Sequence, residues 1–289
     1  MNELTLQAYG KINLGLDIVG KAENGYHLLK MVMQSVTLSD TITMKKIEDG
    51  TSSITLTTNH KELPTNSDNL IYKAAKLLMD EFHITDSVSI HLEKRIPIAA
   101  GMAGGSTDAA AVLKGMNTLF SLSLSQKDLM ERGVTLGADI PYCIMGGTAL
   151  SEGIGEILTP IDTCLHGYII LVKPPVNVST KWAYQNFRKE LVTRPPDIDL
   201  VTDSLKKNDL ATACKGMENV LEAVTIPAHP IIQTIKKRML ELGCSFSLMS
   251  GSGPTVFGLC AEEEKAAEIT ETLKKEFPDS FVTLTTYQS

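Results

Sequence analysis

Apolar and polar residues alternate along the first stretch of the chain, residues 4–18. One face of the extended chain is apolar and carries Ile12, Leu14, Leu16 and Ile18. The other face carries Lys11, Asn13, Gly15 and Asp17. A period of two predicts a β-strand whose apolar face is buried. The polar face is typical either of a solvated surface or of an open catalytic groove, and the pattern leaves both interpretations open.

Similar patterns organise the rest of the first half. Further strands are predicted at residues 32–46, with Asp40 at a turn, at 52–58 and at 87–96. Helical spacing of apolar residues predicts helices at 70–82, 109–120 and 125–136. The last of these helices begins with a capping box of Ser125 and Asp128 and ends at Gly137.

In the second half, strands and helices follow in a different order. Strands are predicted at residues 168–173, 245–249, 255–260 and 281–287. Helices are predicted after the cap residue Ser179 and at 200–206, 209–224, 230–242 and 262–277. A strand followed by helices and then by two strands, a helix and a strand favours an antiparallel sheet backed by helices. The fold class expected for the chain is therefore α+β.

The stretch Pro97–Asp108 reads P-I-A-A-G-M-A-G-G-S-T-D and lies between a predicted strand and a predicted helix. Its glycines leave room for outward-pointing backbone N–H groups, and Ser106 and Thr107 add hydroxyls. The first turn of a helix has unpaired N–H groups and a partial positive charge, so this unit suits a phosphate group. A tight turn that only starts a helix is an equal alternative. The stretch has neither the Walker A pattern nor the G-x-G-x-x-G pattern.

Composition narrows the classes of function. A chain of 289 residues with 43% hydrophobic and 21% charged residues is long enough for two globular domains. The net charge of −7 argues against general nucleic-acid binding, although a phosphorylated small molecule could still bind through local donors. No apolar run approaches the ~20 residues that span a bilayer, and the N-terminus does not resemble a signal peptide. We therefore expect a cytoplasmic protein without a membrane partner. The histidine and cysteine spacings indicate no zinc site.

Three further segments carry candidate chemistry. Glu23–His27 reads E-N-G-Y-H, a turn whose aromatic and imidazole side chains lie on the surface or recognise a base. Asp139 lies in G-A-D-I-P, where it is either a turn former or a general base. The stretch Ser250–Pro254 reads S-G-S-G-P and joins two predicted strands.

The strand with Lys11 and Asn13, the Pro97–Asp108 stretch and the Ser250–Pro254 stretch together resemble the three motifs of the GHMP kinases. The resemblance covers nearly the whole chain. It implies an N-terminal domain, residues 1–158, like domain 2 of ribosomal protein S5, and a ferredoxin-like C-terminal domain, residues 159–289. It also implies an active site between the domains and a reaction in which ATP, carried with Mg²⁺, phosphorylates a small-molecule alcohol.

Within that family, N-G-Y-H and G-A-D-I-P resemble the members that phosphorylate the 2-hydroxyl of a cytidine-diphosphate sugar alcohol in non-mevalonate isoprenoid synthesis. The resemblance implies that Lys11 and Asp139 are catalytic. It implies substrate contacts by Asn13, Tyr26, His27, Asp139 and Tyr184. The residues implied to bind ATP are Asn69, Lys94, Pro97, Ile98, Ala99, Ala100, Gly101, Met102, Ala103, Gly104, Gly105, Ser106 and Thr107. No side chain is assigned as a metal ligand, nucleic acid is not expected as a partner, and the assembly is expected to be a monomer or a homodimer.

The chain departs from the family pattern at a few positions. Met102-Ala103 stands where Leu-Gly is more frequent, so Ala103 is expected to have an ordinary φ and to change the turn slightly. Tyr9-Gly10 stands where Pro-Ala usually precedes the lysine. The alternatives are a GHMP kinase acting on mevalonate or homoserine, a catalytically silent nucleotide sensor of this fold, and an RNA-binding module. N-G-Y-H, the presence of Lys11 and Asp139, and the acidic charge argue against them in turn.

Overall fold

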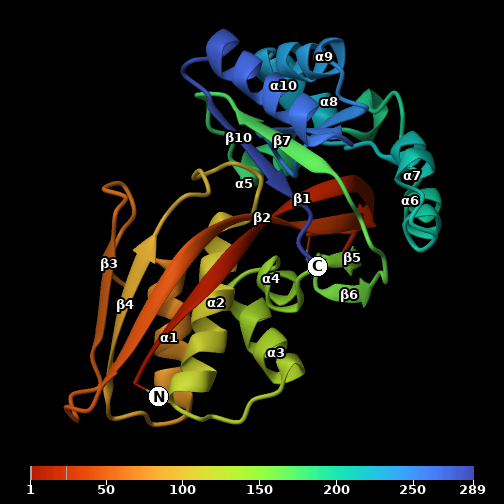
Figure 1. Cartoon of the computed structure of the whole chain (residues 1–289). Coiled ribbons are helices and arrows are strands. Elements are labelled where there is room, and N and C mark those ends of the chain that lie inside the picture. Colours follow the sequence, from red (N-terminus) through yellow and green to blue (C-terminus); the bar gives the residue numbers. More distant parts are fainter. Residues whose placement is uncertain (1, 24) are drawn as a thin grey trace. The chain divides into compact units, whose positions relative to one another are not determined.

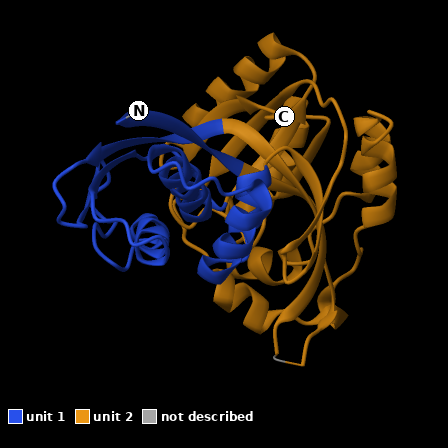
Figure 2. Ribbon diagram, turned by 90° about the horizontal axis from the view of Figure 1, so that it is seen from below, with its two compact units in different colours: residues 1–10, 38–96, 103–145 blue, residues 11–37, 97–102, 146–289 orange. Residues whose placement is uncertain are grey.

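The computed structural model describes residues 2–23 and 25–289, so Met1 and Asn24 lie outside the described residues. The chain forms two compact units, each built from separate stretches of sequence. Unit 1 contains residues 1–10, 38–96 and 103–145, and unit 2 contains residues 11–37, 97–102 and 146–289 (Figure 2). Two long strands, β1 (Glu3–Lys21) and β2 (His27–Ile47), pass from one unit into the other. The domain boundary after residue 158 stays a prediction.

In unit 1, helices pack on a sheet made of β3 (Ile54–Thr58), β4 (Ser87–Glu93) and the ends of β1 and β2 (Figure 1). Strands β3 and β4 are parallel, whereas β4 and β2 are antiparallel. The helices are α1 (Leu70–Glu81), α2 (Gly104–Leu119), α3 (Gln126–Leu136) and α4 (Ile140–Met145). The predicted capping box of α3 is confirmed, because both of its hydrogen bonds are present.

The core of unit 1 lies between α1, α2 and the sheet and includes Ile42, Met44, Leu78, Ile90 and Leu113, all fully buried. Helix α2 approaches the sheet closely at Gly115. A Cβ atom there would lie 2.3 Å from the Met44 sulfur. The absence of a side chain at this position therefore sets how near α2, and with it the Gly104 end of the helix, comes to β2.

Unit 2 contains a four-stranded antiparallel sheet in the order β10-β7-β9-β8. Its strands are β7 (Tyr168–Lys173), β8 (Phe246–Met249), β9 (Val256–Cys260) and β10 (Phe281–Thr286). Helices α9 (Ile231–Leu242) and α10 (Glu263–Glu276) cover this sheet (Figure 1). The short strands β5 (Thr148–Gly153) and β6 (Ile157–Pro160) form an antiparallel pair, and β5 also pairs with β2. The remaining elements are α5 (Thr180–Asn186), a 3₁₀ turn (Lys189–Leu191), α6 (Ile198–Leu205), α7 (Leu210–Gly216) and α8 (Glu222–Ala228).

Two predicted elements were wrong. Asp40 does not lie at a turn but within the continuous strand β2, where its carboxylate is fully buried and accepts hydrogen bonds from the backbone of Arg95 and Ile96. The helix predicted at 209–224 is broken into α7 and α8. The break occurs because the segment around Asn219 forms a parallel bridge with Leu16 of β1, so tertiary pairing overrides local helical pattern.

Candidate active site

Strand β1 places Lys11 and Asn13 in the interior of unit 2. Lys11 is 5% exposed and Asn13 is fully buried, so the alternative of a solvated polar face is wrong for these two side chains. Their apolar neighbours Ile12 and Leu14 are also fully buried, which means that β1 is covered on both faces here. A buried polar face needs internal hydrogen-bond partners, and the site is built from them.

The ammonium of Lys11 is held by neutral oxygen atoms. Its Nζ donates to Asn13 Oδ1 at 2.7 Å and to the Gly101 carbonyl at 3.3 Å. Asn13 Nδ2 in turn lies 3.3 Å from the Met31 sulfur. Among the described residues of unit 2, Lys11 has no carboxylate partner. A buried positive charge without a negative partner in its own unit favours the approach of an anion.

Three segments that are far apart in sequence meet at this lysine. The backbone N–H of Lys11 donates to the Met102 carbonyl at 3.2 Å. The Ser250 hydroxyl donates to the Gly101 carbonyl at 3.0 Å, on the same oxygen that accepts from Lys11. A Cβ atom on Gly251 would lie 3.0 Å from that oxygen and 3.4 Å from Lys11 Nζ. The three motifs singled out in the sequence are therefore in contact within unit 2.

Asn219 holds the third segment in place and was not identified from the sequence. Its side-chain amide is buried and donates to the carbonyls of Met249 and Gly251 at 2.8 Å and 2.7 Å. Its Oδ1 accepts from the Leu221 N–H at 3.0 Å. One side chain thus fixes the turn that carries Gly251, and only the three-dimensional pairing of this segment with β1 makes that role visible.

The glycine-rich stretch adopts an unusual backbone. Ala99, Gly101 and Ala103 all have left-handed φ angles, of 51°, 71° and 55°. The expectation of an ordinary φ at Ala103 was therefore wrong: the alanine adopts the conformation that glycine commonly supplies. A left-handed φ costs an L-residue roughly 1–2 kcal/mol, so the surrounding contacts must hold both alanines in place.

Helix α2 begins within this stretch, at Gly104, and its first turn has no side-chain cap. Gly105 is exposed and Ser106 is half-buried, whereas Thr107 is buried and its hydroxyl donates to the Tyr9 carbonyl at 2.6 Å. The uncapped N–H groups and the positive end of the helix dipole are features that suit a phosphate group, and the binding of ATP by this stretch stays a prediction.

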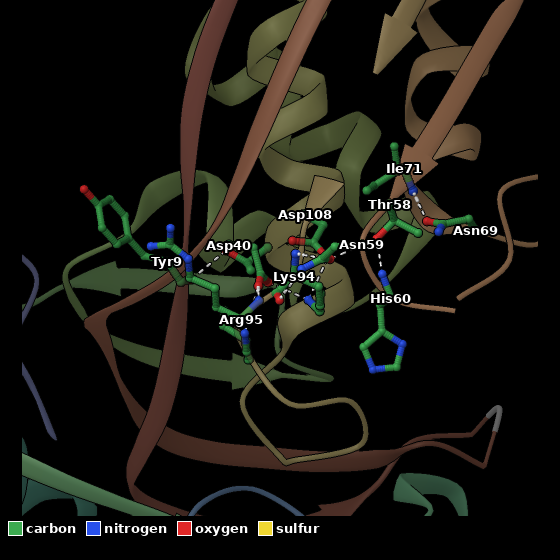
Figure 3. Close-up of polar contacts among 12 residues, drawn as sticks. Tyr9, Asp40, Thr58, Asn59, His60, Asn69, Ile71, Lys94, Arg95 and Asp108 are labelled. Atoms are coloured by element: carbon green, nitrogen blue, oxygen red, sulfur yellow. Dashed lines mark hydrogen bonds and ion pairs between the residues drawn. The ribbon is translucent and has the colours of Figure 1, made fainter. Parts of the chain in front are cut away.

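Asp139, Asn69 and Lys94 all belong to unit 1. Asp139 is half-buried and directly precedes α4. Asn69 caps α1, since its Oδ1 accepts from the Ile71 N–H at 2.9 Å (Figure 3). Its Nδ2 donates to the Pro64 carbonyl at 2.7 Å. The ammonium of Lys94 is buried between two carboxylates. The roles predicted for these residues stay predictions.

The aromatic residues predicted to contact the substrate belong to unit 2. His27 Nε2 donates to the Tyr184 carbonyl at 3.1 Å, and the two rings lie 5.6 Å apart at an angle of 30°. Phe187 contacts the His27 ring edge-on at 6.2 Å, a contact that the sequence did not indicate. The Tyr26 side chain is 61% exposed. Of the N-G-Y-H segment, Asn24 lies outside the described residues.

Comparisons with known proteins extend over the whole chain. Residues 69–147 match the family model for the GHMP kinases N terminal domain, and residues 201–279 match the one for the GHMP kinases C terminal. The 4-diphosphocytidyl-2-C-methyl-D-erythritol kinase of Lachnoclostridium phytofermentans is 52% identical over 93% of this chain and 91% of its own length. The enzyme of that name from Clostridium botulinum (strain Eklund 17B) is 45% identical over 98% of this chain and its full length.

Solved structures agree. A crystal structure of a 4-(cytidine 5'-diphospho)-2C-methyl-D-erythritol kinase has a TM-score of 0.83 and 29% identity, covering 99% of this chain and 100% of the other. Homoserine kinase from Cytophaga hutchinsonii shares the fold, with a TM-score of 0.79 and 19% identity over 100% of this chain and 95% of its own. The predicted fold class is confirmed. The chain belongs to the GHMP kinases, within the branch formed by the 4-diphosphocytidyl-2-C-methyl-D-erythritol kinases.

Proposed function

We propose that the protein transfers the γ-phosphoryl group of ATP to the 2-hydroxyl of 4-diphosphocytidyl-2-C-methyl-D-erythritol, a step of the non-mevalonate route to isoprenoid precursors. The observation that carries this proposal is the meeting of Lys11, Gly101 and Gly251 around one carbonyl oxygen. Relatives with 45% to 52% identity carry the name of this kinase, which supports the choice of acceptor.

The glycine-rich stretch and the first turn of α2 would bind the phosphates of ATP. Residues 97–107 offer backbone N–H groups in a turn shaped by three left-handed φ angles, and the helix that follows has no side-chain cap. Backbone donors of this kind are already oriented before the ligand arrives, so little reorganisation is needed on binding.

Asp139 would accept the proton of the substrate hydroxyl, and Lys11 would stabilise the charge on the transferring group. A correctly placed general base contributes about 10²–10⁴ to a rate. The neutral hydrogen-bond partners of Lys11 leave its charge uncompensated within unit 2, which suits a role toward an anionic phosphoryl group. Asn13 accepts a hydrogen bond from Lys11 and so orients the lysine side chain. Asn13 would also contact the substrate.

The cytosine base would lie against the aromatic residues. His27 and Tyr184 already contact each other, and Tyr26 is 61% exposed. Stacking on aromatic side chains contributes about 1–3 kcal/mol per base in nucleic-acid binders, and an imidazole edge adds hydrogen-bonding selectivity. A phosphoryl acceptor without a nucleobase would gain no binding energy from these aromatic residues.

Mg²⁺ would neutralise charge on the phosphate oxygens of ATP. Within residues 2–23 and 25–289 no cluster of three histidine, cysteine, aspartate or glutamate side chains could hold a metal ion. The Thr107 hydroxyl is already bonded to Tyr9, while Ser106 is half-buried in the first turn of α2. The residues present therefore fit an ion that arrives with the nucleotide rather than one held by the protein alone.

The partner would be this small molecule, with neither nucleic acid nor membrane involved, in a cytoplasmic monomer or homodimer. The net charge of −7 supports the exclusion of nucleic acid. In the described part of the chain, no helix is both long enough and apolar enough to cross a bilayer.

The proposal is tested by measuring ADP release from Mg-ATP with diphosphocytidyl-methylerythritol, mevalonate and homoserine as parallel acceptors. We expect turnover with the cytidyl acceptor alone. Turnover with mevalonate or homoserine instead would refute the proposed acceptor but would support the kinase reaction. ATP binding without turnover of any acceptor would refute the kinase reaction itself.

A further inference from the structure

Three ionisable side chains are buried together in unit 1, close to the residues that precede Pro97 and to the start of α2. Lys94 follows β4, Asp40 lies within β2, and Asp108 lies in the second turn of α2. Their side chains are at most 4% exposed. The Lys94 ammonium donates to the carboxyl oxygens of both Asp40 and Asp108, the latter at 2.8 Å (Figure 3).

Asp40 holds the residues that come directly before the glycine-rich stretch. Its Oδ2 accepts from Lys94, while its Oδ1 accepts from the backbone N–H groups of Arg95 and Ile96, the latter at 2.8 Å. These are the two residues that immediately precede Pro97. One carboxylate therefore holds three consecutive residues. Because Asp40 belongs to β2, the position of these residues is fixed relative to that strand.

Lys94 holds the first turns of α2, where the second half of the glycine-rich stretch lies. A Cβ atom on Gly104, the first residue of α2, would lie 2.9 Å from Lys94 Nζ, so the ammonium packs directly against the backbone there. The same ammonium binds Asp108 one helical turn further on. The start of α2 is thereby tied to the residue that precedes Arg95 and Ile96.

Between these two ends lies a strained backbone. Ala99 and Ala103 have left-handed φ angles, which persist only where the surrounding structure over-determines them. Two rigid ends held at a fixed separation restrict the conformations open to the seven residues between Ile96 and Gly104. Such a restriction favours the turn that aims backbone N–H groups at a ligand.

We propose that Lys94, Asp40 and Asp108 form a clamp that holds both ends of the glycine-rich stretch and so preorganises it for the phosphates of ATP. This inference deepens the proposed function and rests on its assignment of ATP to this stretch. Lys94 is then a positioning residue, which differs from the sequence-based prediction that it contacts the nucleotide. Its burial between two carboxylates is the reason for the different assignment.

The test compares Asp108→Ala with Asp108→Asn. Alanine removes the hydrogen bond to Lys94, whereas asparagine keeps an acceptor of the same shape. We expect the Kd of Mg-ATP, measured by calorimetry without acceptor, to rise at least tenfold in Asp108→Ala and much less in Asp108→Asn. The KM of ATP should follow the Kd, while the KM of the second substrate stays near the wild-type value. A merely destabilised protein would lose active molecules and kcat without this selective change.

Two further variants complete the design. Lys94→Met should weaken ATP binding as Asp108→Ala does, and the double variant should be no worse than the more affected single one, because both remove the same link. Asp80→Ala removes an exposed ion pair with Lys76 in the same unit and should leave ATP binding unchanged. If Asp108→Ala does not fold, Asp108→Ser replaces it. The serine hydroxyl is one bond closer to the backbone than the carboxyl oxygens of aspartate, so the contact with Lys94 is weakened while a polar group is kept.

The results decide between the two roles of Lys94. Weak binding in Lys94→Met with normal binding in Asp108→Ala would overturn the clamp and favour a direct contact of Lys94 with the nucleotide. Equal losses in Asp108→Ala and Asp108→Asn would also overturn it. Wild-type protein that binds Mg-ATP without phosphorylating the cytidyl acceptor would refute the proposed function and leave this comparison valid. Absence of Mg-ATP binding would refute both.

Discussion

Asp108 makes the stability of the protein depend on pH in a defined direction. Burial raises the pKa of the Asp108 carboxyl from 3.8 to about 8; the charge of Lys94 lowers this pKa and that of Asp40 raises it. Asp108 Oδ1 is buried and has no hydrogen-bond partner among the described residues. Asp40 accepts two backbone N–H groups in addition to Lys94, whereas burial keeps the pKa of Asp108 raised, so Asp108 carries a proton in the folded protein at neutral pH.

The sign follows from the raised pKa. The folded state binds a proton at Asp108 more tightly than the unfolded state, so the stabilisation is complete below the ordinary pKa and is lost as the pH rises through about 8. For a single group with this pKa, the free energy of unfolding falls by about 2–3 kcal/mol between about pH 6 and about pH 9. Asp108→Asn resembles the protonated carboxyl at every pH and should lack this loss.

Urea unfolding of the wild type and of Asp108→Asn across that pH range measures the effect. Titrating groups remote from Asp108 contribute equally to both proteins, so the difference between their slopes reports Asp108 together with its neighbours Lys94 and Asp40. The exposed Asp80→Asn is the matched control and should keep the wild-type slope. If the wild type and Asp108→Asn lose stability in parallel above neutral pH, Asp108 is not protonated in the folded protein and the reasoning fails.

Three substitutions test other parts of the site. Asp139→Asn should abolish turnover and leave the Kd of Mg-ATP nearly unchanged; more than a tenth of the wild-type kcat would exclude the role of a base. Gly251→Ala places a Cβ atom 3.0 Å from the Gly101 carbonyl in a left-handed backbone, so kcat should fall at least tenfold, with a near-normal rate as the contrary result. Tyr184→Ala should raise the KM of the cytidyl acceptor about tenfold with little change in the KM of ATP, and equal changes in both would argue against stacking.

Local pattern predicted most of the elements. The alternation around Lys11, the capping box at Ser125 and Asp128 and the amphipathic stretch that forms α10 depend on neighbours in sequence, so the chain itself displays them. The glycine-rich stretch follows β4 as expected, but α2 begins at Gly104, within the stretch, and not at the predicted residue 109.

The failures share a physical cause, which is contact between distant residues. Asp40 looks like a turn residue until Lys94 and two backbone N–H groups compensate its burial within a strand. The helix around Asn219 is interrupted because that segment pairs with β1, and Ala103 adopts a glycine-like φ inside a held loop. Sequence indicated which segments carry the chemistry, but it could not show that Gly101 accepts from both Lys11 and Ser250.

The most direct test of the account follows the phosphoryl group itself. ATP labelled at the γ-phosphate is incubated with the protein and diphosphocytidyl-methylerythritol, and the product is identified by mass and by ³¹P NMR. The account predicts one labelled phosphate on the 2-hydroxyl of the cytidyl acceptor, and none when Lys11→Met replaces the wild type. Label that appears only as inorganic phosphate, or that reaches the acceptor equally well in Lys11→Met, would contradict it.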